Sequence, residues 1–179
     1  MGFSAAISGG IMMTMIIVVL IMAIPAVINA NITTSRAYSE RAQLDSEYIK
    51  TSIQITDLQA LPDTDIVNVT LSNDGSSKLW NYQKFNVLVT YDYIPDPLAS
   101  PQRITENLDY AGITQIVSAA GSWSITGFID DNIDPQILNP EESLTIRGRL
   151  NHDIAISAEL VAVTISTDNG VIVSKAVIL

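Results

Sequence analysis

The sequence predicts a transmembrane α-helix at the N-terminus followed by an all-β antiparallel sandwich. Three observations lead to this fold class. No ionisable side chain occurs between Met1 and Ser35. After Thr51 the apolar residues change from a continuous run to an alternating pattern, and turn-forming residues interrupt that pattern at short intervals. We therefore divide the chain into residues 1–50, an apolar helix with a stalk, and residues 51–179, a β-sandwich domain.

The apolar segment from Ile11 to Ile28 is long enough to cross a membrane. Its 18 residues include one polar side chain, Thr14, and about 20 apolar residues span a hydrocarbon core of ~30 Å. A cleaved secretory signal peptide is the alternative, but such a peptide carries a basic start and a shorter apolar run. Residues 1–10 contain no Lys or Arg, so we expect a retained single-pass anchor.

The side of the membrane on which the domain lies follows from weaker signals. Arg36 and Arg41 come after the span, and the positive-inside rule would place them in the cytoplasm. Two N-glycosylation sequons, which begin at Asn31 and Asn68, favour export instead. We expect the domain outside the cytoplasm, with Asn31 and Asn68 as candidate glycosylation sites.

Residues 31–50 contain no Gly or Pro, so the helix is expected to continue beyond the membrane as a stalk. Leu44 and Tyr48 share one face of this helix. Pairs of opposite charge stand four residues apart, as on a helix surface: Arg36 with Glu40, and Arg41 with Asp45. The stalk is either a solvated linker or a packing surface, and in the second case the candidate partner contacts are Tyr38, Leu44 and Tyr48.

The domain is predicted to contain about seven strands, each rich in Val, Ile, Thr or aromatic residues. Strands without intervening helical periods indicate an antiparallel sandwich that is Ig-like in the broad sense. Residues 94–121 interrupt the even spacing, and Pro95, Pro97 and Pro101 mark them as a long excursion. The expected strands begin at Ile53 and then cover Ile66–Leu71, Phe85–Tyr93, Ser122–Ile129, Ser143–Leu150, Glu159–Thr167 and Val171–Leu179.

Two turns are predicted from their glycines. Asp74-Gly75 is a pair able to take the positive φ of a tight hairpin. Asn169-Gly170 is typical of a type I′ turn, which makes the last strand a hairpin partner. If that strand lies at a sheet edge it can pair with another subunit, although Lys175 discourages such pairing.

The domain is strongly acidic, which limits its partners. The net charge of −10 lies entirely after Thr51, where 16 acidic residues outnumber 6 basic ones. Such a surface repels nucleic-acid phosphates and anionic headgroups, so no nucleic-acid partner is expected. The chain has no cysteine, which removes disulfides, thiol nucleophiles and thiolate metal sites.

No catalytic signature is present in the sequence. His152 is the only histidine, and no nucleophile elbow, P-loop or HExxH motif accompanies it. Trp80 and Trp123 are expected to pack in the core or at a sheet edge, since each adjoins apolar residues. We therefore expect a non-enzymatic protein without a cofactor, and a membrane-tethered extracytoplasmic ligand-binding protein is the alternative from another class.

The acidic segment from Asp130 to Glu142 is the sharpest candidate for metal binding. Oxygen-bearing side chains occupy calcium-loop positions 1, 3, 5 and 12, namely Asp130, Asn132, Asp134 and Glu141. Pro135 occupies position 6, where an EF-hand needs Gly, so an irregular calcium site or a solvated acidic loop remains. By way of bridging cations, the candidate partner-binding residues here are Asp130, Asp131 and Glu142.

Several stretches together resemble one protein family. They are the opening Met1-Gly2-Phe3-Ser4 that leads directly into an apolar helix, Trp123–Asp130, Asp134–Glu141, Leu144–Ile146 and the final hairpin Ser166–Val171. The chain resembles the accessory proteins of the archaellum, the archaeal flagellum, of the FlaG and FlaF stator type, which are archaellin-related and type IV pilin-like. The resemblance extends over essentially the whole chain.

The resemblance implies a pilin-like helix that carries an Ig-like domain and anchors the rotary motor outside the membrane. It also implies partners, which are other archaellum proteins or an S-layer protein, and further copies of the chain through the N-terminal helix. Archaellins and archaeal pilins have a short basic leader before the apolar helix, whereas residues 1–10 here carry no Lys or Arg. A stator-type anchor in the cell membrane is therefore preferred, and a polymerising subunit of an extracellular filament is the alternative.

Overall fold

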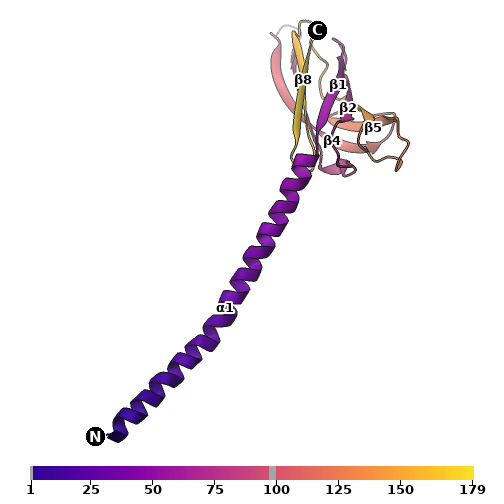
Figure 1. Ribbon diagram of the computed structural model, residues 1–179. Coiled ribbons are helices and arrows are strands. Elements are labelled where there is room, and N and C mark those ends of the chain that lie inside the picture. Colours follow the sequence, from indigo (N-terminus) through magenta and orange to yellow (C-terminus); the bar gives the residue numbers. More distant parts are fainter. Residues whose placement is uncertain (1, 97–99) are drawn as a thin grey trace. The chain divides into compact units, whose positions relative to one another are not determined.

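Figure 1 shows the computed structural model of the chain, which describes residues 2–96 and 100–179. The chain forms two compact units, Met1–Asp45 and Ser46–Leu179. The first unit is helical, and the second contains the last helical turn and the strands. Met1, at which the opening motif begins, and Pro97 lie outside the described residues.

Helix α1 runs without interruption from Gly2 to Lys50. The prediction that the helix continues beyond the apolar segment is therefore confirmed. Pro25 lies inside the helix, where its missing N–H removes one backbone hydrogen bond. After Lys50 the hydroxyl of Thr51 donates to Glu47 O at 2.8 Å, which satisfies a carbonyl in the last turn.

Within residues 46–96 and 100–179 the chain forms eight strands and one 3₁₀ turn. Buried and exposed side chains alternate along most of the strands, so that one face of each lies on the core. The elements are β1 (Ile53–Ala60), β2 (Ile66–Asn73), η1 (Tyr82–Lys84), β3 (Asn86–Tyr93), β4 (Gln102–Ile113), β5 (Ser122–Ile129), β6 (Ser143–Arg149), β7 (Leu160–Ser166) and β8 (Ile172–Ile178).

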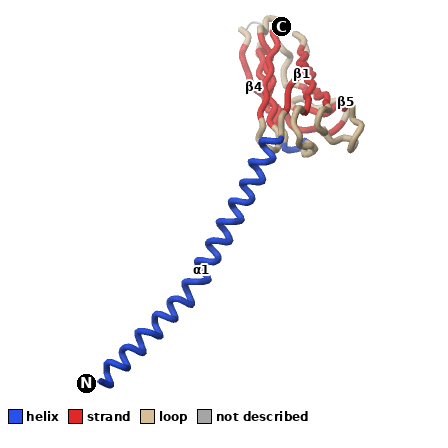
Figure 2. Tube along the Cα trace, in the orientation of Figure 1, coloured by secondary structure: helices blue, strands red, loops and turns tan. Residues whose placement is uncertain are grey.

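The strands form one sheet in the order β1-β2-β6-β5-β4-β3-β7-β8, which folds over on itself into a sandwich (Figure 1). Figure 2 shows how the strands gather into one body joined by loops. Neighbouring strands are antiparallel except β4 and β5, which run parallel. The predicted β-sandwich is therefore confirmed, and the expectation of a wholly antiparallel sheet is corrected at this one pair.

The sequence pattern does not predict β4. The expectation of an excursion over residues 94–121 is wrong for Gln102–Ile113, which pairs with β3 and β5. The strand is missed because one of its buried side chains is a carboxylate, that of Glu106. Glu106 accepts hydrogen bonds from the Tyr91 hydroxyl at 2.5 Å and from the backbone N of Asn151 at 3.1 Å. These hydrogen-bond partners make a charged residue compatible with the core. They are distant in the sequence, so the alternation of apolar and polar residues along one strand does not reveal them.

The loop after β2 caps the C-terminus of α1. The last carbonyls of a helix have no hydrogen-bond partners within the helix. Here Lys50 O accepts hydrogen bonds from the backbone N of Ser76 at 2.8 Å and of Ser77 at 3.2 Å. Gly75 permits this approach, because a Cβ there would lie 2.5 Å from Lys50 O and 2.4 Å from Ser52 N. Gly75 does not have a positive φ, so the hairpin predicted from Asp-Gly is wrong and the glycine is needed for space.

Strands β7 and β8 form the predicted C-terminal hairpin. Its turn is not the predicted type I′, because Gly170 has a φ of 81° but Asn169 is not in the positive region, and type I′ needs both. Gly170 N donates to Thr167 O at 3.1 Å. The Asn169 side chain donates to Thr51 Oγ1 at 2.9 Å, which ties the hairpin to the start of β1.

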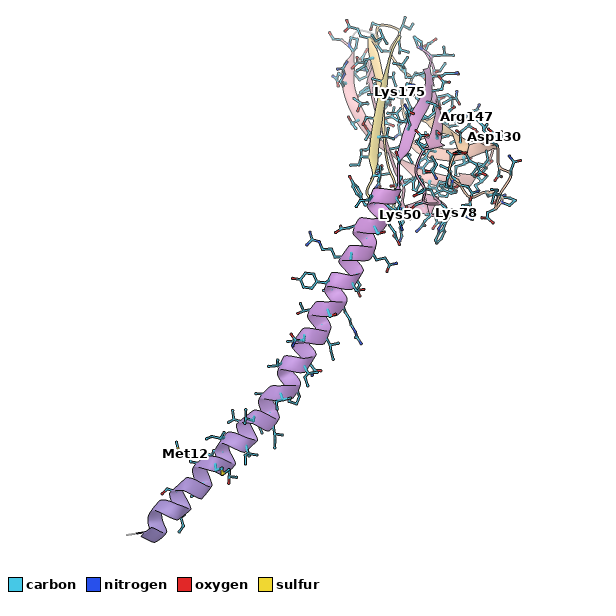
Figure 3. The ribbon with its side chains drawn as sticks, in the orientation of Figure 1. Met12, Lys50, Lys78, Asp130, Arg147 and Lys175 are labelled. Carbon is cyan, nitrogen blue, oxygen red and sulfur yellow. The ribbon has the colours of Figure 1, made fainter. Side chains whose placement is uncertain are left out.

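Strands β1 and β8 are the two edges of the sheet, and they lie side by side. In the described part of the chain no backbone ladder joins them. Lys175, labelled on β8 in Figure 3, donates from Nζ to Thr56 O in β1. The lysine therefore links the two edges where the ladder is missing, and it keeps a charge at the edge that β8 exposes.

Candidate functional site

The apolar segment of α1 is exposed. From Ile7 to Ile28 every side chain that the structure describes is exposed, and the helix is long and apolar enough to cross a membrane. The polar side chain of Thr14 donates to Gly10 O at 2.8 Å, so its hydroxyl needs no water. A helix of this kind is stable where lipid or other apolar helices cover it.

The predicted contacts on the stalk are exposed as well. The exposed fraction is 72% for Tyr38, 66% for Leu44 and 53% for Tyr48. The charged residues of the stalk do not form the predicted four-apart ion pairs within the described residues. Exposed tyrosine side chains are suited to contact a partner. The role of all three residues in such a contact stays a prediction.

The acidic segment Asp130–Glu142 forms a compact loop between β5 and β6. Leu79 and Leu138 join it to the segment before η1 through two backbone hydrogen bonds of 3.0 and 2.8 Å. Buried inside the loop, Asn139 donates from Nδ2 to Glu142 Oε2 at 2.9 Å and to Ile137 O at 3.2 Å. These contacts close the loop around one carboxylate.

That carboxylate belongs to Glu142, whose exposed fraction is only 6%. Burial alone raises the pKa of a carboxyl group. Hydrogen bonds from the side chain of Asn139 and from the backbone of Asn139, Ile133 and Asn132 outweigh burial and hold the pKa of Glu142 below its ordinary range. Glu142, one of the predicted partner contacts, is therefore buried and organises the loop. Of the other two predicted contacts in this segment, Asp130 is exposed and Asp131 is half-buried.

The four candidate metal ligands are not gathered into one site. Of the residues that the structure describes, no group of three His, Cys, Asp or Glu side chains is placed to hold a metal ion. The Asp134 carboxylate instead forms an ion pair with Lys78. Asp130 and Glu141 have φ of 62° and 69°, which bends the loop sharply at both ends. Asn132, the remaining candidate, is exposed.

An exposed tryptophan lies beside this loop. Trp80 is 65% exposed, so the expectation that it packs in the core or at a sheet edge is wrong, whereas Trp123 is fully buried as expected. Trp80 lines a hollow of about 280 Å³ together with Lys78 and Ser77. Figure 3 shows Lys78 near Lys50, where the domain begins. The signal for exposure is present in the sequence, because Trp80 follows a run of turn residues and not an alternating strand.

The two sequons differ in their surroundings. Asn31 is exposed on α1. Asn68 lies in β2, and its Oδ1 accepts a hydrogen bond from Arg147 Nε at 2.9 Å. Asn68 is half-buried whereas Asn31 is exposed, so Asn31 is the more accessible of the two candidate glycosylation sites.

His152 lies in the loop between β6 and β7. Its ring stacks on Tyr93 with the ring centroids 4.4 Å apart. It also lines a hollow of about 540 Å³ with Asp63 and Asp153. The stacking gives the imidazole a packing role in this loop.

The fold of the chain is similar to that of a solved structure, "The archaeal flagellum of Methanospirillum hungatei strain JF1". The TM-score is 0.53 at 10% sequence identity, and the match covers 100% of this chain and 93% of that chain. The chain has an archaellin-like fold. The resemblance to archaellum proteins expected from the sequence is thus confirmed at the level of the fold.

Two further similarities involve Sulfolobus acidocaldarius. They are the archaellum periplasmic stator protein FlaG, with a TM-score of 0.49 at 19% identity over 71% of this chain and 99% of that chain, and the complex of FlaF and FlaG, with a TM-score of 0.48 at 18% identity over 70% of this chain and 87% of that chain. Neither likeness reaches a TM-score of 0.5. No protein-family model matches the chain, and a comparison with curated proteins finds no significant match.

Proposed function

We propose that this chain is a structural component of the archaellum, held in the cell membrane by α1 with its sandwich outside the cytoplasm. The observation that carries the proposal is an exposed apolar helix joined to an archaellin-like sandwich. A fold alone does not determine a function, so the exposed helix supplies the argument from the chain's own chemistry. The proposed role is anchoring of the motor, and it is non-enzymatic.

The helix provides the anchorage through the hydrophobic effect. Each Å² of apolar surface moved from water into lipid contributes roughly 25 cal/mol, and the exposed side chains from Ile11 to Ile28 are apolar apart from Thr14. The sandwich provides a rigid surface for partners. Its binding free energy comes from the surface buried in the contact and not from a reacting group.

The proposed partners are other archaellum proteins or an S-layer protein, together with further copies of the chain through α1. On the stalk, the proposed contacts are Tyr38, Leu44 and Tyr48, which are open on the helix. On the loop they are Asp130 and Asp131, which carry the negative charge that a basic or cation-bridged partner needs. No metal or other cofactor forms part of the proposal beyond such bridging cations.

A filament subunit is the second candidate function. The likeness to the archaeal flagellum subunit extends over 100% of this chain, which includes the apolar helix as well as the sandwich. In a filament the apolar helices of many copies would cover one another in the fibre core, in place of lipid.

Two experiments test the proposal. Cells that lack the chain should fail to swim, and normal swimming without it would rule out the proposed role. Electron microscopy of the purified full-length protein then separates the two candidates, because an anchor gives discrete particles whereas a filament subunit gives regular fibres with a core of helices.

A further inference from the structure

One end of the sandwich carries a group of exposed aliphatic side chains. Strands β1 and β8 finish at this end, which Figure 1 marks by the C-terminus, and Figure 3 labels Lys50 at the other end of the domain. We call it the apex. Four large aliphatic side chains there are between 43% and 82% exposed, namely Leu61, Ile94, Ile156 and Ile178.

Three hollows join these side chains into one surface. A hollow of about 530 Å³ is lined by Leu61 and Ile178. A second, of about 570 Å³, is lined by Ile178 and Ile156. A third, of about 540 Å³, is lined by Ile156 and Ile94. The lining of the first hollow is mainly apolar, whereas Asp63, His152 and Asp153 contribute to the third. Exposed apolar side chains grouped in this way, with polar residues beside them, mark a site of contact with another molecule.

The backbone holds Ile156 away from the core. The two residues before it, Ile154 and Ala155, are buried, whereas Ile156 is 74% exposed. Ala155 N donates to Asp92 O at 2.8 Å, and Ala158 N donates to Ala155 O at 2.9 Å. The exposure of Ile156 is therefore fixed by hydrogen bonds on both sides of it.

Carboxylates line two of the three hollows beside these aliphatic side chains. Asp63, Asp153 and Glu159 are exposed, and within the described residues none of them is in an ion pair. The rim of the apex is therefore negative. The arginines nearby are already paired with other carboxylates, Arg103 with Asp92 at 2.8 Å and Arg149 with Asp65 at 2.7 Å.

We infer that the apex docks a different protein, whose contact surface is apolar at its centre and rich in Lys or Arg at its rim. The apolar centre would cover the four aliphatic side chains, and the basic rim would meet the carboxylates. A second copy in a two-fold contact would bring the same carboxylates together, and an anionic membrane surface carries the same sign of charge. The inference rests on the proposed function, because the partner would be another component of the same assembly.

Substitutions in cells test the surface. In a strain that lacks the native chain, Ile156→Asp and Ile178→Asp should each abolish swimming while the variant remains in the membrane at normal amounts. The matched control is Ile116→Asp, because Ile116 is 76% exposed but lies in the loop between β4 and β5. Normal swimming by both apex variants overturns the inference. It leaves the proposed function intact, because that function is tested separately by the strain that lacks the chain.

Photo-cross-linking identifies the occupant. A photoreactive residue at position 156 or 178 of the full-length chain, irradiated in intact cells, should give an adduct with one second protein. The double change Asp63→Lys and Asp153→Lys should lower its yield severalfold, whereas Asp168→Lys, at an exposed position in the turn between β7 and β8, should not. An adduct of two copies, an adduct with lipid, an equal yield from position 116, or no adduct at all contradicts the inference.

Discussion

At the scale of single residues, Glu142 determines how the acidic loop responds to pH. Its carboxylate accepts hydrogen bonds from Asn139 Nδ2 at 2.9 Å and from the backbone N of Asn139 at 3.0 Å. The pKa of Glu142 is therefore lower in the folded chain than the ordinary value of 4.5. The unfolded chain takes up the proton first as the pH falls, so the stabilisation is fully present above the ordinary value and is lost toward the folded pKa.

We expect Glu142→Gln to destabilise the sandwich at neutral pH. The glutamine amide would place its own N–H groups against backbone N–H groups that now donate hydrogen bonds to the carboxylate, at a cost on the order of 2 kcal/mol. The difference from the wild type should shrink as the pH falls from neutral through the ordinary value toward the folded pKa, because the native carboxylate then takes up a proton too. Urea unfolding of the full-length protein over a series of pH values measures it, and a difference that stays the same as the pH falls would count against this role of Glu142.

Gly75 is a second residue whose role comes from its contacts. We expect Gly75→Ala to destabilise the domain by about 1–3 kcal/mol, because its Cβ would meet two backbone atoms, Ser52 N and Lys50 O. Ser76→Ala is the matched control, since it keeps the backbone N–H that caps Lys50 and should change stability by less than about 0.5 kcal/mol. Thermal unfolding compares the two variants, and equal midpoints would show that the glycine is not needed for space.

At the scale of elements, the sequence predicts those strands that bury one apolar face. Strands β2, β6 and β7 alternate in both sequence and burial, and their predicted positions agree with the structure. Strand β4 is not predicted, because the burial of Glu106 depends on hydrogen-bond partners far away in the sequence. The turn at Asp74-Gly75 is misjudged for a related reason, since the neighbour that requires glycine there is the end of α1.

The candidate site also divides into features that depend on local sequence, which can be predicted, and features that depend on distant contacts, which cannot. The exposed apolar helix and the open stalk residues can be predicted, because they depend on composition along one helix. The order inside the acidic loop cannot, because Asn139 and Glu142 act through hydrogen bonds that only the folded loop creates. The apex is also missed, since Leu61 and Ile178 are 117 residues apart in the chain (178 minus 61) and meet only through the sheet.

The edge strands give a prediction about association. Lys175 links β8 to Thr56 O in β1 and places a charge at the sheet edge. We expect Lys175→Ile to remove both effects, so that the variant self-associates more strongly than the wild type through its strand edges. Analytical ultracentrifugation of the full-length protein in detergent measures this at several concentrations. The role assigned to Lys175 fails if the two proteins sediment alike throughout.

At the scale of the whole molecule, the helix is longer than a single crossing requires. The residues of α1 up to Ser35 carry no ionisable side chain, and at 1.5 Å per residue they extend on the order of 50 Å, against a hydrocarbon core of ~30 Å. The surplus is suited to a tilted span or to packing against other apolar helices. Both fit an anchor that takes part in an assembly.

The account depends most on an exported sandwich held by a membrane helix, and this is open to direct measurement. The chain has no cysteine, so Ile116→Cys introduces a single thiol at an exposed position of the sandwich. In intact cells, a membrane-impermeant maleimide should label this variant as fully as it does after lysis, and the labelled chain should remain with the membrane or with the filament. Labelling that requires lysis would place the sandwich in the cytoplasm and contradict the account.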